Sequence, residues 1–263
     1  RLSYPLSAYG AVIFDAQSFS QIPTRGYEIK GLKVQVPTNY FPKGEGGRTV
    51  GEYDRNVTTG ADAGGNIRWD GNFRGDTEQF TDPDNVNYEK VWTDNPAWVF
   101  YDLVINDRYG VGKYISKDQV DKFELFKIAR YCDELVDDGK GGTEPRFTCN
   151  LYLQEKAEAL KVLKDVTSVF RGMLYWLDGE IQFSQNRYQN PIYNFSKSNV
   201  IGGLFKYTSS KQQYRSNQIR VTWNDPEAMY KKAVEIVEDT NNILETRRIV
   251  SKDVVAFGCT SRG

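Results

Sequence analysis

The chain has 263 residues, 39% of them hydrophobic and 26% charged, which is ordinary for a soluble globular protein with a sizeable core in one large domain or two ordinary ones. Its net charge of -1 excludes the global basic field that attracts proteins to nucleic acid. It contains no histidine, which excludes histidine-based catalytic triads, general bases and metal ligands.

The sequence contains neither a bilayer-spanning apolar run nor a signal peptide, so direct membrane insertion is not expected. Because the chain starts at Arg1 instead of methionine and stops abruptly at Gly263, we expect a fragment of a longer polypeptide. The cysteines Cys132, Cys149 and Cys259 are widely spaced and odd in number, which matches neither a disulfide framework nor a zinc ribbon. We expect three reduced thiols that are mostly buried.

Residues 1–94 are predicted to be a β-rich region with one long loop. An alternation of apolar and polar residues predicts a strand that ends at Pro37. Its apolar members are Leu32, Val34 and Val36. Residues 43–66 are glycine-rich and polar but lack the Gly-Lys-Ser/Thr ending of a phosphate-binding loop, so we interpret them as a long exposed loop or a flexible hairpin.

Residues 95–190 are predicted to form an α+β region that begins with two helices. Asn95 and Pro96 are typical of the N-cap and first residue of a helix. The apolar face of this helix contains Ala97, Val99, Phe100, Leu103 and Val104. A second helix is predicted from Asp118 to Leu135.

A strand, a helix and a hairpin are then predicted in succession. Phe147 to Leu153 alternates as a half-buried strand does, and Glu155 to Phe170 has the apolar spacing of an amphipathic helix that packs on the sheet containing this strand. Gly172 is expected to end the helix in a left-handed conformation. Asp178-Gly179 between apolar runs predicts a tight hairpin turn.

Residues 191–263 are predicted to be a third, β-rich region. Short strands are expected at Pro191 to Phe195 and Leu204 to Tyr207, separated by a turn. Longer strands are expected at Ser216 to Trp223, Lys232 to Glu238 and Ile249 to Ala256. Asn241-Asn242 is compatible with a turn. The predicted fold class is α+β, with mixed sheets and packed helices.

No set of residues predicts a catalytic, cofactor-binding or metal site. Asp76, Asp82 and Asp84 do not have the spacing of a calcium loop, and Cys149 has no histidine base. The acidic residues of the second predicted helix are interpreted as a solvated face. They are Glu124, Asp133 and Glu134.

Several segments, in order along nearly the whole chain, resemble the tail tip attachment protein J family (host specificity protein J) of lambda-like siphophages. Each segment is weak alone, and their joint order carries the resemblance. They are Val36–Tyr40, Trp69–Gly71, Asn95–Trp98, Tyr101–Leu103, Arg108–Gly110, Ala129–Leu135, Pro145–Asn150, Val169–Trp176, Val221–Pro226 and Gly258–Gly263.

The resemblance implies a structural role without catalytic residues or cofactors. Family members form a homotrimeric hub, similar to the baseplate hub of contractile-tailed phages, that caps the tail tube and opens for genome passage. The hub contacts the distal tail ring and the tape-measure protein, and DNA passes through its lumen without specific binding. The expected location is the tail tip of the virion, after assembly in the bacterial cytoplasm. The receptor-binding end of the family protein is absent from this chain.

Two other classes of function remain open from the residues alone. Exposed tryptophan and tyrosine side chains would suit a glycan- or ligand-binding module, which a glycan array would detect. A cell-wall hydrolase would need a pair of carboxylates across a cleft, and a peptidoglycan zymogram would detect it.

Overall fold

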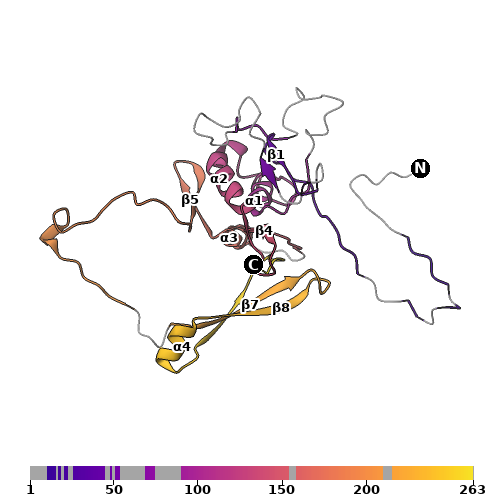
Figure 1. Cartoon of the computed structure of the whole chain (residues 1–263). Coiled ribbons are helices and arrows are strands. Elements are labelled where there is room, and N and C mark those ends of the chain that lie inside the picture. Colours follow the sequence, from indigo (N-terminus) through magenta and orange to yellow (C-terminus); the bar gives the residue numbers. More distant parts are fainter. Residues whose placement is uncertain are drawn as a thin grey trace. The chain divides into compact units, whose positions relative to one another are not determined.

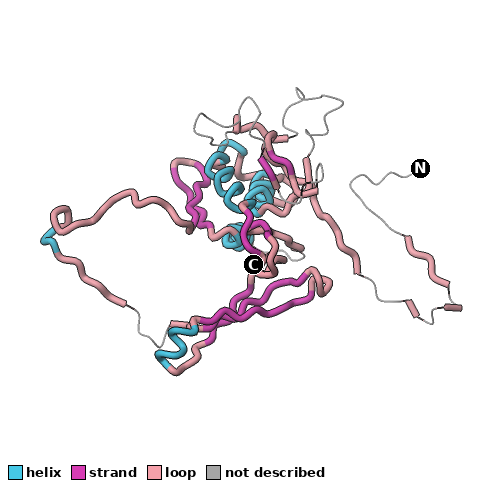
Figure 2. Tube along the Cα trace, viewed as in Figure 1, coloured by secondary structure: helices cyan, strands magenta, loops and turns pink. Residues whose placement is uncertain are grey.

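The computed structural model of the chain describes residues 11–15, 17–18, 21–22, 26–44, 48, 51–53, 69–74, 90–153, 158–209 and 215–262. The chain divides into two units, residues 1–30 and 31–263. In the first unit, the Asp15 carboxylate accepts hydrogen bonds from the Gln17 amide and the Ser18 hydroxyl. The described helices and strands all lie in the second unit (Figures 1 and 2), and their mixture confirms the predicted α+β class.

Helix α1, Pro96–Ile105, begins where the sequence predicts. The Asn95 side-chain oxygen accepts a hydrogen bond from the Ala97 amide at 3.0 Å, and Pro96 needs no partner because it has no N–H. Of the predicted apolar face, Val99 and Leu103 are only half-buried. The fully buried side chains are Ala97, Trp98, Phe100, Tyr101 and Val104.

Helix α2, Lys122–Asp133, is shorter than predicted at both ends. Asp121 caps it by accepting a hydrogen bond from the Glu124 amide at 3.0 Å, and the preceding residues form a separate 3₁₀ turn, η4, Lys117–Gln119. Strand β3, Leu135–Asp137, follows it directly and pairs antiparallel with β4, Thr143–Pro145. The prediction of helix through Leu135 was therefore wrong, because this residue has a cross-strand partner.

Helix α3, Ala159–Val169, confirms the third predicted helix within the described residues. Its stripe buries Leu163 and Val166, and the helix packs on α1 and on the following hairpin. That hairpin, β5, Gly172–Leu177, and β6, Glu180–Gln185, confirms the predicted turn. Asp178 and Gly179 both have positive φ angles, 54° and 85°, as such a turn requires.

The predicted strand from Phe147 to Leu153 does not form. Its amides bond to three separate segments: Phe147 to the Cys132 carbonyl, Cys149 to the Asp94 carbonyl and Asn150 to the Gly258 carbonyl. No neighbouring strand provides a ladder among the described residues. The prediction that α3 packs on a sheet containing this stretch was therefore wrong.

The end of α3 also differs from the prediction. Arg171, not Gly172, has the left-handed conformation, with φ of 55°. Gly172 is instead required by space, because a Cβ there would lie 2.2 Å from the Phe170 ring. Phe170 itself is fully buried, so its ring has no room to move aside.

Among the described residues in the N-terminal part of the second unit, strand pairing is short. Strands β1, Tyr40–Phe41, and β2, Glu52–Tyr53, pair antiparallel. The strand predicted to end at Pro37 is reduced to two isolated bridges, one from Val34 and one from Pro37. Strand β2 lies inside the predicted loop 43–66, so these two residues are paired rather than part of an open loop. Residues 45–47, 49–50 and 54–66 of that loop lie outside the described residues, as do Asp76, Asp82 and Asp84.

The C-terminal residues form a three-stranded sheet of order β8-β7-β9, which confirms its three long predicted strands. Strand β7, Gln218–Asp225, is antiparallel to β8, Lys231–Glu238, and parallel to β9, Ser251–Val255. Instead of the turn predicted at Asn241-Asn242, helix α4, Thr240–Thr246, follows β8. Asp239 caps this helix by accepting a hydrogen bond from the Asn242 amide at 3.0 Å, which favours a helix over a turn.

The two short strands predicted before this sheet are absent. Residues 191–195 and 204–207 are extended but unpaired, on either side of a turn that contains the 3₁₀ helix η5, Ile201–Gly203. The sequence pattern therefore predicted two strands for which the described residues provide no pairing partner.

One aromatic-rich core unites segments from the first two predicted regions. The Trp69 ring stacks on Phe126 of α2 with centroids 5.2 Å apart, and Phe73 stacks on Tyr101 of α1 at 4.4 Å. These packed rings fix the N-terminal segments against the helices. The division into regions 1–94, 95–190 and 191–263 stays a prediction.

Gly110 provides a test of how tightly the turn after α1 is packed. A Cβ at this position would lie 2.0 Å from the Leu103 carbonyl oxygen, which is backbone and has little freedom to move. We expect Gly110→Ala to lower the free energy of unfolding by about 2 kcal/mol or more in urea titrations. Gly31→Ala is the control, because nothing lies within 4 Å of its added Cβ. Equal effects of the two substitutions would contradict the close approach.

Candidate functional site

Five of the segments that carry the family resemblance meet at one place, which we call the motif junction. It consists of Asn95, Cys132–Glu134, Arg146–Asn150, Trp223–Asn224 and Gly258–Arg262. Sequence reasoning named all five segments but had no means of placing them together.

The first link in the motif junction joins the two long helices. The Asn95 side-chain amide donates to the Ala129 carbonyl at 2.9 Å and to the Asp133 carboxylate at 2.7 Å, while its oxygen caps α1. One buried side chain thus holds the start of α1 against the last turn of α2. A buried amide with both ends bonded fixes this arrangement strongly, since breaking it would leave polar groups unpaired.

The second link joins α2 to the stretch after β4. The Arg146 guanidinium forms an ion pair with Glu134 at 3.0 Å and lies 4.4 Å from the centre of the Tyr131 ring. The Phe147 amide donates to the Cys132 carbonyl at 3.1 Å. The Cys132 carbonyl, in the last turn of α2, thus has a hydrogen-bond partner outside the helix.

The third link joins that stretch to the C-terminal residues. The Asn150 amide donates to the Gly258 carbonyl at 2.8 Å, and its side chain donates to the Thr260 hydroxyl at 2.8 Å. The Asn224 amide donates to the Cys259 carbonyl at 3.2 Å, which connects the same residues to β7. Residues 258–260 therefore bridge the helical core and the C-terminal sheet.

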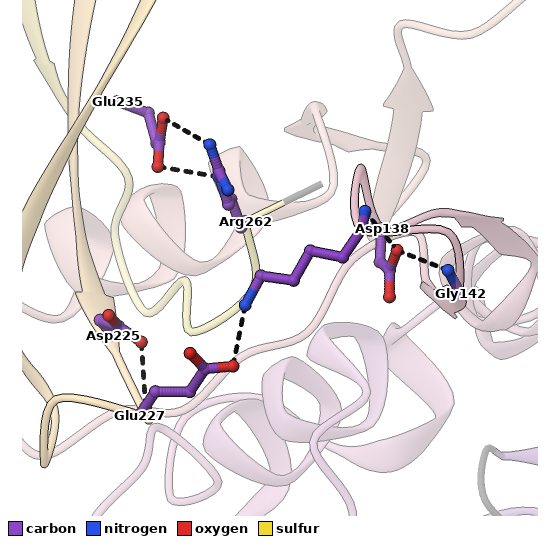
Figure 3. Close-up of polar contacts among 7 residues, drawn as sticks. Asp138, Gly142, Asp225, Glu227, Glu235 and Arg262 are labelled. Atoms are coloured by element: carbon purple, nitrogen blue, oxygen red, sulfur yellow. Dashed lines mark hydrogen bonds and ion pairs between the residues drawn. The ribbon is translucent and has the colours of Figure 1, made fainter.

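Two ion pairs lie at the edge of the motif junction (Figure 3). Lys140 binds Glu227 at 2.8 Å and Arg262 binds Glu235 at 2.9 Å. These side chains are largely exposed to solvent, so each pair contributes little to stability. The buried backbone hydrogen bonds are the stronger part of the connection.

Asp133 corrects the interpretation of a solvated acidic face. Its carboxylate is half-buried and accepts hydrogen bonds from the Tyr53 hydroxyl at 3.0 Å and from Asn95. Burial raises the pKa of Asp133 to about 8, against the opposing effect of these hydrogen bonds. Glu124 and Glu134 form surface ion pairs, as a solvated face predicts. The sequence has no local signal that separates Asp133 from these neighbours.

The cysteines are packing residues in this structure. Cys132 and Cys149 are buried, as predicted for most of the thiols, and Cys259 is half-buried with its thiol donating to the Ser261 carbonyl at 3.1 Å. Burial raises the pKa of Cys149 to about 12 and that of Cys132 well above the usual thiol range. A thiol held in its protonated form is a poor nucleophile.

Within the described ranges, no group of three or more acidic or cysteine side chains could hold a metal ion. In the same ranges, no helix is long and apolar enough to cross a bilayer. The chemical features that stand out are exposed apolar side chains. They lie on the β5–β6 hairpin, along residues 186–209 and on the C-terminal sheet.

A protein family matches the C-terminal part of the chain. Residues 158–263, which include the C-terminal half of the motif junction, match the family described as "Putative phage tail protein". This part of the chain is therefore similar to phage tail proteins.

Two curated relatives extend the match to the whole chain. The chain is 35% identical over 263 residues to "Tip attachment protein J" of Escherichia phage SECphi27, covering 100% of the chain and 19% of the relative. It is 32% identical over 261 residues to "Tip attachment protein J" of Escherichia phage SECphi4, covering 99% of the chain and 20% of the relative. The chain thus spans about a fifth of their length, and the resemblance to J-type tail proteins is confirmed.

The raised pKa of Asp133 predicts a pH-dependent stability. In the unfolded chain an aspartate has a pKa of about 3.9, so between about pH 4 and 8 the unfolded state binds fewer protons than the folded state. The contribution of protonated Asp133 to the free energy of unfolding is complete below about pH 4 and is lost as the pH rises to about 8. We expect the melting temperature to fall across this window, and Asp133→Asn to remove most of the fall. Glu134→Gln is the control; an unchanged slope in Asp133→Asn would contradict the assignment.

The motif junction can be tested by comparing its buried and exposed contacts. Gly258 has a φ of 63°, and a Cβ there would lie 2.7 Å from the Leu151 side chain. We expect Gly258→Ala to lower the free energy of unfolding by about 1–3 kcal/mol, because it strains the bridge. Lys140→Met removes only an exposed ion pair and should change stability by less than about 0.5 kcal/mol. Chemical denaturation of both variants checks this, and the reverse ranking would contradict it.

Proposed function

We propose that this chain is a structural segment of a phage tail tip, within the central hub that caps the tail tube and takes part in virion attachment and genome delivery. The observation that carries the proposal is the similarity over the whole chain to two tip attachment proteins J. The match of residues 158–263 to a phage tail family supports the same role.

The role is structural and not enzymatic. Among the described acidic side chains, Glu124 and Glu134 form surface ion pairs and Asp133 accepts a hydrogen bond from Tyr53, while the two buried thiols stay protonated. A structural hub needs broad surfaces for association, which exposed apolar and aromatic side chains provide.

Three copies of the chain form the hub, which contacts the distal tail ring and the tape-measure protein. DNA passes through the lumen during ejection without specific binding, and the net charge of -1 is compatible with this passage. The hub assembles in the cytoplasm of the bacterial host and is located at the tail tip of the finished virion.

The mass of the purified chain in solution tests the assembly. Size-exclusion chromatography with light scattering, over a concentration series, should show a trimer of the 30.1 kDa chain in equilibrium with monomer. Gold-labelled antibody against this chain should label the tail tip of intact virions in negative-stain electron micrographs. Virions that carry the protein at the head or along the tail tube would contradict the proposed function.

A further inference from the structure

An extended, apolar-rich segment follows the β5–β6 hairpin, and we call residues 186–209 the arm. Apart from η5, it has no regular secondary structure (Figure 2). Ile192 and Ile201 are 94% and 99% exposed, and further large apolar side chains along the arm are exposed with them. They are Tyr188, Tyr193, Phe195, Leu204, Phe205 and Tyr207. A single chain in water leaves this apolar area uncovered, which marks a surface for a partner.

In both unpaired parts of the arm, aromatic side chains two residues apart lie together. Tyr193 and Phe195 lie two residues apart with ring centroids 4.8 Å apart, and Phe205 and Tyr207 repeat this spacing at 6.5 Å. Side chains at i and i+2 share a side only in an extended backbone. The turn between these parts is closed by its own hydrogen bonds, including Asn199 Nδ2 to the Asn194 carbonyl at 2.8 Å.

The charge of the arm is of one sign. Between Glu180 and Asp225 the sequence has no acidic residue. The cationic residues of the arm are Arg187, Lys197 and Lys206. An acidic surface is therefore the complement of the arm.

Strand β5 has one free edge. In the hairpin, Leu177 pairs with Glu180 across a two-residue turn, and the Asn186 amide bonds to the Arg171 carbonyl. This register directs the backbone groups of Gly172, Leu174 and Trp176 away from β6. No other described strand pairs with this edge. It is an open template for another strand.

The outer side of β5 is apolar and ends at acidic residues. Met173, Tyr175 and Leu177 form a column of exposed side chains along the edge strand, opposite the polar column of β6. Asp178 and Glu180 lie at the turn of the hairpin. These three features of the hairpin complement the arm. The free edge suits its unpaired backbone, the apolar column suits its exposed apolar side chains, and the acidic turn suits its positive charge.

We propose that residues 191–195 of one copy of this chain add as a strand to the free edge of β5 in a second copy. Tyr193 and Phe195 cover the apolar column, and Lys197 lies beside the acidic turn. The inference rests on the proposed function, since it names the contact through which copies of the hub associate. A contact of this kind is head-to-tail, and rotation between copies can close it into a ring of three.

The occupant is a second copy because both halves of the contact belong to this chain and neither pairs with another strand among its described residues. Only residues 186–190 separate β6 from the extended part of the arm, yet the described arm forms no ladder with its own hairpin. Nucleic acid fits the cations and aromatic rings but not the exposed aliphatic residues Ile192, Ile201 and Leu204.

The test places a photo-cross-linking benzoylphenylalanine at Phe195 in the 263-residue chain. A mixture of ¹⁵N-labelled and unlabelled protein is irradiated, and mass spectrometry identifies the linked peptides. We expect cross-links between labelled and unlabelled chains, at residues 173–177. Cross-links confined to one chain, cross-links at another surface, linkage to an added oligonucleotide instead of protein, or no cross-link would each overturn the proposal.

A matched pair of variants tests the backbone part of the contact. Trp176→Pro removes an outward-pointing N–H without breaking a hydrogen bond of the hairpin, and Trp176→Ala removes the same side chain but keeps the N–H. Sedimentation velocity should show association about tenfold weaker for the proline variant than for the alanine variant. Equal association of the two would overturn the proposal.

The arm variant Tyr193→Ser/Phe195→Ser provides a second measurement that does not depend on the fold of the hairpin, because both side chains are exposed. It should also weaken association about tenfold. An unchanged association constant would overturn the arm contact. A trimer that persists in all these variants would leave the proposed function intact while excluding the arm as its cause.

Discussion

The stretch from Phe147 to Asn150 has to satisfy its buried backbone amides without a neighbouring strand, and the rest of the structure depends on how it does so. Three of its amides bond to carbonyls in α2, in the residue before the N-cap of α1, and in the C-terminal residues. Unpaired buried amides are costly, so these bonds determine where the three segments lie. The helical core and the C-terminal sheet are thereby connected through one irregular segment instead of a shared sheet.

Several of the segments that resemble the J family contact one another at this junction. Each one provides either a backbone group or a side chain to a neighbouring segment: Asn95 to the end of α2, Arg146 to Glu134, and Asn150 to Thr260. The exposed ion pairs around the junction add little to this, because solvent screens them.

The buried core around α1 and α2 and the exposed hairpin and arm have different roles in the molecule. Tryptophan, phenylalanine and tyrosine rings around α1 and α2 are closely packed and carry stability. The hairpin and the arm expose comparable side chains that the single chain does not cover. A tail tip made of several copies would use such surfaces for association, and this is the physical connection between the structure and the function proposed for it.

The sequence alone determined two local features, one helix start and one tight turn. Asn95-Pro96 began α1, and Asp178-Gly179 closed the β5–β6 hairpin, because caps and tight turns depend on nearby backbone geometry. Only the tertiary structure decided which alternating segments found a ladder: β7 did, whereas residues 147–153 and 191–195 did not. Likewise, Asp133 and Glu134 are adjacent carboxylates, yet Glu134 forms a surface ion pair with Arg146, whereas Asp133 accepts hydrogen bonds from distant Tyr53 and Asn95, and burial raises its pKa to about 8. Strand pairing and the burial of a carboxylate both depend on residues that are distant in the sequence. A local sequence pattern carries no information about those residues.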